Sequence, residues 1–135
     1  MQINMTFKNI FYTFSAFILI LSLSGCGTKP VHDVEQHAVP SNIQSSKQVK
    51  DAIIRAGASL GWIIKVKDSS HLEGTLLLRT HVAKISIPYS KDSYSLIYQS
   101  SENLDYNAED KTIHNNYNGW ISNLDKNIQV QLSVM

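Results

Sequence analysis

Two segments of the chain repeat apolar residues with the period of an α-helix. The first begins at the serine pair 45–46, where either hydroxyl can cap free backbone N–H groups, and Gly61 ends it. Its apolar residues at helical spacing are Val49, Ala52, Ile53, Ala56 and Leu60. The second runs from Ile113 to Leu132, with apolar residues mostly three or four apart. We expect two amphipathic helices, each packed on an apolar surface.

Between these segments, four runs alternate apolar and polar residues with the period of a β-strand. They span residues 62–67, 72–79, 83–87 and 94–99. Pro88 ends the third run because it has no N–H to donate, and Gly74 suggests a bulge in the second. The links between the runs are too short for parallel crossovers, so we expect an antiparallel meander.

These elements predict an α+β fold for residues 46–135. The predicted architecture is a four-stranded antiparallel meander sheet with an N-terminal and a C-terminal helix packed on one face. The polar and acidic stretch 100–112 is expected to be a long loop between the sheet and the second helix.

The N-terminal 25 residues have the pattern of a signal peptide. One basic residue, Lys8, precedes an apolar run from Ile10 to Leu23. This run is shorter than the roughly 20 residues that a helix needs to cross a bilayer. The chain is polar from there on, so a permanent transmembrane helix is the weaker interpretation.

The tetrapeptide Leu23-Ser24-Gly25-Cys26 resembles the lipobox of bacterial lipoprotein precursors. The resemblance implies that Cys26 is the site of lipid attachment, palmitate included, and the first residue of the mature protein. The next residue is Gly27 rather than the aspartate that retains enterobacterial lipoproteins in the inner membrane, which implies the periplasmic face of the outer membrane. The alternative is ordinary cleavage near Ser24 or Gly25, which would leave Cys26 as a free thiol.

Residues 26–45 are expected to be a lipidated cysteine followed by a flexible tether. The segment holds two prolines, several polar residues and no sustained apolar period. His32 and His37 lie five residues apart within it, and in a flexible tail such a pair is usually solvated rather than bound to a metal.

Composition narrows the class of protein. With 43% hydrophobic and 17% charged residues among 135, the chain suits one small globular domain. The balance of 12 Lys and Arg against 11 Asp and Glu disfavours nucleic acid as a partner, and the single cysteine excludes a disulfide framework. We expect no cofactor and no metal, since the histidines fit no metal-ligand spacing.

Several strings of the folded segment resemble a group of small, uncharacterised proteobacterial lipoproteins. They are Gly61-Trp62, Leu78-Arg79-Thr80-His81, Tyr94 to Tyr98, Ser101 to Tyr106, and the spacing of Ile113-His114, Tyr117-Asn118 and Trp120. No activity is established for that group, so the resemblance implies a location and a fold but no catalytic or binding residue.

The strand alternation places basic residues on the sheet face that no helix covers. Lys65, Lys67, Arg79 and Lys84 would share this face, with His81 at the strand edge. The simpler interpretation is a solvated face, and the functional one is weak docking to an anionic envelope component.

Aromatic residues divide into expected core and expected surface. Trp62, Tyr94, Tyr98, Tyr117 and Trp120 fall on buried stripes. Tyr89 and Tyr106 fall in loops, where they are better placed to meet a partner.

The candidate surface for a ligand or partner therefore comprises Lys65, Arg79, His81, Lys84, Tyr106 and His114. The sequence predicts a membrane-anchored lipoprotein whose small periplasmic domain binds an envelope protein or an anionic envelope component. The alternative is a periplasmic enzyme with a site around Arg79, His81 and His114. No Gly-x-Ser-x-Gly motif supports a hydrolase, and His114 could instead cap the second helix.

Overall fold

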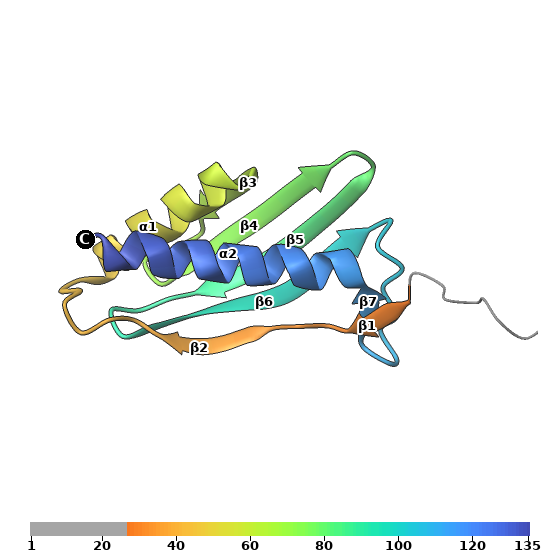
Figure 1. Ribbon diagram of the computed structural model, residues 1–135, viewed down its shortest axis with the longest axis horizontal. Helices are drawn as coiled ribbons and strands as arrows, with labels where there is room; N and C mark the ends of the chain where they lie inside the picture. The colour runs from red at the N-terminus through yellow and green to blue at the C-terminus, as the bar shows by residue number, and fades with distance from the viewer. Residues whose placement is uncertain (1–26) are drawn as a thin grey trace, which may run out of the picture.

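A computed structural model describes residues 27–135, so the predicted signal peptide and Cys26 lie outside the described residues (Figure 1). The chain forms seven strands and two helices in this range. They are β1 (Thr28–Pro30), β2 (Val34–Ala38), α1 (Ser46–Ser59), β3 (Trp62–Val66), β4 (His71–Leu78), β5 (His81–Pro88), β6 (Ser93–Glu102), β7 (Thr112–His114) and α2 (Asn115–Ser133).

The fold is α+β, with one five-stranded and one two-stranded antiparallel sheet. The larger sheet has the order β2-β6-β5-β4-β3, and β1 pairs with β7 in the smaller one. The two helices pack together and lie over the larger sheet (Figure 1). The four predicted strands are therefore adjacent in sequence order, as a meander requires, and β2 adds a fifth strand beside β6.

Helix α1 begins and ends where its sequence predicts. The Ser45 hydroxyl accepts a hydrogen bond from the backbone N–H of Gln48, whose side-chain oxygen accepts one from the Ser45 N–H. This reciprocal pair satisfies two of the N–H groups that a helix start leaves free. Gly61 follows the last turn with a φ of 82°, a conformation that costs glycine little.

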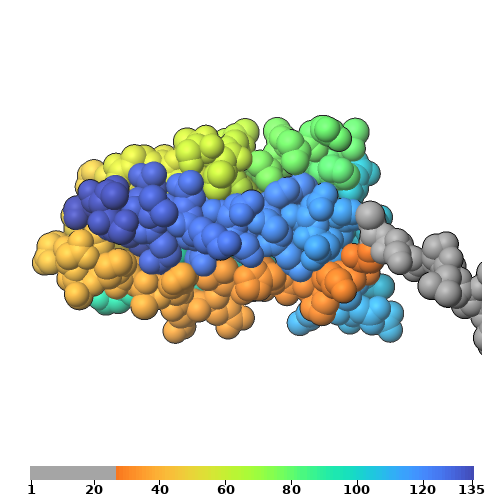
Figure 2. Space-filling model, in the orientation of Figure 1, coloured from red at the N-terminus to blue at the C-terminus, as the bar shows by residue number. Residues whose placement is uncertain are grey.

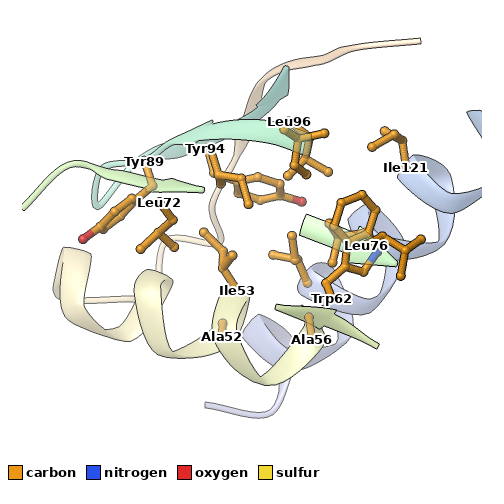
Figure 3. Close-up of a cluster of buried hydrophobic side chains, with 14 of the residues drawn as sticks. Ala52, Ile53, Ala56, Trp62, Leu72, Leu76, Tyr89, Tyr94, Leu96 and Ile121 are labelled. Carbon is orange, nitrogen blue, oxygen red and sulfur yellow. The ribbon is translucent and has the colours of Figure 1, made fainter. Parts of the chain in front are cut away.

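The core lies between the helices and one face of the sheet. Ile53 and Ala56 of α1 point toward Trp62, Leu72 and Leu76 of the sheet (Figure 3). Helix α2 contributes its predicted stripe, with five fully buried residues: Tyr117, Ile121, Leu124, Ile128 and Leu132. Burial of this apolar layer holds the two helices against the sheet.

The segment expected to be a flexible tether is instead part of the folded unit. Strand β1 pairs with β7, and β2 pairs with β6 through Val34 opposite Leu96. Ile43, between β2 and α1, is buried in the core. The periodicity of β2 is hidden because a bulge separates Val34 from His37, where Gln36 has a φ of 46°.

Two smaller expectations are also corrected. Gly74 pairs regularly on both sides, and a Cβ there would lie 3.0 Å from Ile85 Cγ1, so the glycine permits close packing. The bulge of this region lies between Lys84 and Ile85. Tyr89, expected on the surface, is buried in the core.

Candidate functional site

The sheet face opposite the helices is not covered by any other described element. We call it the open sheet face. It consists of the outward residues Ile63, Lys65, Glu73, Thr75, Leu77, Val82, Lys84, Ser86 and Ile97.

Strand register arranges these side chains in rows across the sheet. Lys65 lies opposite Glu73, whose carboxylate is also 3.9 Å from Lys67 Nζ. Lys84 lies opposite Thr75, one row further along. The positive charge that the sequence predicts here is therefore partly balanced by Glu73.

Two large apolar side chains are exposed on the same face. Ile63 is 49% exposed and lies opposite Thr75, whereas Leu77 is 58% exposed and lies opposite Val82. Leu77 follows Thr75 by two residues on β4, so the two apolar side chains occupy neighbouring rows. The centre of the open sheet face is thus apolar as well as basic.

A shallow open depression of about 510 Å³ lies beside this centre, near the β3–β4 turn. Its polar lining includes Lys67, Glu73, Ser86 and Gln99. At its rim, the Ser70 N–H donates to Asp68 Oδ1 at 2.8 Å, and this bond lowers the pKa of the Asp68 carboxyl. Arg79, His81 and His114 do not line this depression.

Arg79 and His81 lie at the end of the sheet rather than on the open sheet face. Arg79 is in the β4–β5 turn, six residues and therefore about 20 Å along β4 from the Lys65–Glu73 pair. The ring of His81 lies on the helix side, 6.4 Å from Trp120, and its Nδ1 is 2.6 Å from the carbonyl oxygen of Asn103.

Tyr106 and His114 have local structural partners. The Tyr106 ring stacks on Tyr98 at a centroid distance of 4.3 Å. His114 Nδ1 accepts the N–H of Asn116 at 3.2 Å, which confirms the capping interpretation. Among the described residues, no hydrogen bond joins Arg79, His81 and His114.

Sequence reasoning missed a polar cluster between β2, β6 and α2. His37 Nδ1 and the Tyr94 hydroxyl both approach Asp125 Oδ1, at 2.7 and 2.6 Å, and Gln129 Nε2 donates to the Tyr94 hydroxyl at 2.8 Å. The His37 ring also stacks on Tyr94. The four residues come from three elements, and nothing in their spacing indicates that they meet.

Burial keeps the Tyr94 hydroxyl of this cluster protonated. Desolvation, and then the hydrogen bond to Asp125, raise the pKa of Tyr94 far above its ordinary value. Tyr94 is therefore a hydrogen-bond donor rather than a nucleophile near neutral pH. The arrangement ties an edge strand to the helix layer, and its chemistry is that of a structural network.

Within residues 27–135, no group of three or more His, Cys, Asp or Glu side chains is close enough to hold a metal ion. None of the helices in this range combines the length and apolar character needed to span a membrane. Comparison of the chain with protein families, with curated protein sequences and with solved structures finds no match.

Proposed function

We propose that this chain is a membrane-anchored bacterial lipoprotein whose domain binds another protein of the cell envelope through the open sheet face. The lipobox-like tetrapeptide ending in Cys26 supports the anchor and a location on the periplasmic face of the outer membrane. The anchored module presents its open sheet face to a partner and acts by binding rather than by catalysis.

The exposed pair Ile63 and Leu77 carries this proposal. Apolar side chains exposed in neighbouring rows, and surrounded by polar ones, have the pattern of a protein–protein interface with an apolar centre and a polar rim. Glu73 partly balances the neighbouring lysines, and exposed apolar side chains lie among them, so the face suits a protein better than a polyanion.

Crosslinking in cells tests the binding face. A photoreactive residue at Thr75, between Ile63 and Lys84, should capture a partner in the unaltered protein. The double variant Ile63→Ser with Leu77→Ser should reduce that product at least tenfold and leave the domain folded, because neither side chain belongs to the buried core. Val130→Ser is the matched control because Val130 is 57% exposed on α2. Equal crosslinking in the double variant and the control would refute a partner at this face.

Charge reversal distinguishes an anionic envelope component from a protein. Lys65→Glu with Lys84→Glu would abolish capture of a polyanion, and binding would weaken steeply with salt. For the protein partner proposed here, removal of Ile63 and Leu77 should have the larger effect.

The anchor has a separate test. Cys26→Ser should release the domain from the membrane fraction or stall the precursor, because the serine hydroxyl cannot form the thioether. A variant that is processed normally and stays with the outer membrane would show that the lipid is not on Cys26.

A further inference from the structure

We propose that one end of the domain, formed by β1, β7, the loop 103–111 and the β4–β5 turn, lies directly against the lipid surface. We call it the anchor end. The inference rests on the proposed lipidation of Cys26, and it specifies how the domain is oriented. Helix α2 would then lead away from the membrane. The open sheet face, on the side of the sheet opposite the helices, would extend in the same direction.

The chain between the proposed lipid and the fold is very short. Cys26 precedes Thr28, the first residue of β1, by two positions. Two extended residues span about 7 Å, which is comparable with the thickness of the headgroup region on one side of a bilayer. A lipid on Cys26 therefore holds β1 at the level of the headgroups.

Strand β1 is attached to the domain by several hydrogen bonds, so it does not act as a tether. Thr28 pairs with His114, and the Val31 N–H donates to the Lys111 carbonyl at 2.9 Å. Asn118 on α2 adds two more bonds: its side chain accepts the His32 N–H and donates to the Pro30 carbonyl, each at 2.9 Å. Through these bonds, a lipid attached to Cys26 would also hold β7 and the start of α2 close to the membrane surface.

The other elements of the anchor end are connected to β7. The Leu104 carbonyl accepts the His114 N–H at 2.8 Å, and the Asn103 side chain donates to the Thr80 carbonyl at 2.6 Å. These bonds place the β4–β5 turn and the loop beside β1. Figures 1 and 2 show these elements at one end of the molecule, with the C-terminus at the other.

The anchor end carries exposed apolar side chains but no excess of positive charge. Leu78, the last residue of β4 before the β4–β5 turn, is 45% exposed, and Tyr106 in the loop is 38% exposed. The charged residues of this end are Lys29, Arg79, Lys111, Asp105, Glu109 and Asp110. Because acids and bases nearly balance, the contact depends on the anchor and on apolar contact, not on anionic lipids.

The opposite end is held well away from the lipid. Helix α2 starts next to β7 and has 19 residues, so it extends about 28 Å from that end. The open sheet face runs along the strands away from the anchor end, so of its residues Leu77 and Val82 lie nearest the lipid and the rest lie further from it. This orientation leaves Ile63 and Thr75 accessible to a partner that lies alongside the domain.

Depth measurement on the full lipidated chain tests the orientation. Cys26 is the single cysteine and its thiol is consumed by the lipid, so an engineered cysteine can be labelled alone. Leu78→Cys probes the anchor end. Val134→Cys, at a side chain that is 75% exposed beyond α2, is the matched control at the opposite end. Each carries an environment-sensitive fluorophore in vesicles of phosphatidylethanolamine and phosphatidylglycerol that contain headgroup-labelled quencher lipids.

We expect quenching at position 78 to be several times that at position 134. Inserting a Gly/Ser tether of about 20 residues after Cys26, with a mean span of about 25 Å, should remove most of this difference. Equal quenching at both positions in a chain shown by mass spectrometry to carry the lipid would overturn the orientation and leave the proposed function intact. Absence of lipid on Cys26 would instead overturn both.

Discussion

His37 Nδ1 lies 2.7 Å from Asp125 Oδ1 and joins strand β2 to helix α2 across 88 positions of the chain. The same oxygen accepts the Tyr94 hydroxyl of β6 at 2.6 Å. Three elements therefore meet at one carboxylate atom. An edge strand that would otherwise depend on one irregular ladder is held to the helix layer as well.

Asp125→Ala should destabilise the domain by about 1 to 3 kcal/mol, because His37 and Tyr94 both lose their shared acceptor. Amide exchange in β2 should accelerate more than exchange in β4. Asp51→Ala is the control, since the Asp51–Lys47 pair lies exposed on α1 and should contribute under about 1 kcal/mol. Equal urea midpoints for the two variants would contradict a structural role for the cluster.

Tyr94 and Tyr117 should respond in opposite ways to loss of their hydroxyls. Tyr94→Phe removes bonds to Asp125 and Gln129 and should cost about 1 to 2 kcal/mol. The Tyr117 hydroxyl is buried without a hydrogen-bond partner among the described residues, so Tyr117→Phe should be neutral or stabilising by up to about 1 kcal/mol. Thermal unfolding of both variants at neutral pH checks this order.

Because the pKa values of Tyr94 and Tyr117 are raised, we expect the folding stability of the domain to fall at alkaline pH. Burial raises the pKa of both above the ordinary value of 10.0, so above pH 10 the unfolded chain loses these protons while the folded chain keeps them. Stability is then full below pH 10 and falls as pH rises, by about 1.4 kcal/mol per pH unit for each tyrosine. Urea midpoints at pH 9, 10 and 11 measure the slope, to which Tyr89 and Tyr98 also contribute because burial raises their pKa as well. Tyr117→Phe should lower the slope by about 1.4 kcal/mol per pH unit, and an unchanged slope would show that Tyr117 does not contribute.

Both helices and the four strands β3 to β6 follow their local patterns, which is why periodicity predicts them. The Ser45 cap, Gly61 and the stripe from Tyr117 to Leu132 each act within a few residues of the feature that they determine. Periodicity does not predict strand β2, because its bulge breaks the alternation and its partner β6 lies about 60 residues away.

The residues of the candidate surface also differ in whether a local pattern determines their position. Lys65 and Lys84 lie on the open sheet face because strand alternation fixes the side of a residue within a regular strand. Arg79 has a positive φ in a turn, where alternation no longer applies. His81 is the first residue of β5 and lies two residues before the buried Ala83, so alternation within β5 puts it on the helix side. The His37–Asp125 contact depends wholly on tertiary structure, so no spacing in the chain indicates it.

Gly57 offers the sharpest test of helix–sheet packing. A Cβ at this position would lie 2.6 Å from Ile64 Cγ1 and 2.8 Å from its Cδ1, closer than side chains tolerate. Gly57→Ala gains about 1 kcal/mol of helix propensity, but overpacking costs about 1 to 3 kcal/mol, so we expect a net loss of up to about 2 kcal/mol.

Gly119→Ala is the matched control within the other helix, because nothing lies within 4 Å of a Cβ there. It should stabilise the domain by about 0.5 to 1 kcal/mol. Ile64→Ala should cost less in the Gly57→Ala background than in the unaltered protein, since it then removes the side chain that collides with the new methyl group. Urea unfolding of the four-member cycle measures this coupling. Additive effects of the two substitutions would mean that the backbone of α1 shifts to admit the methyl group, and that Gly57 is not required for close approach to β3.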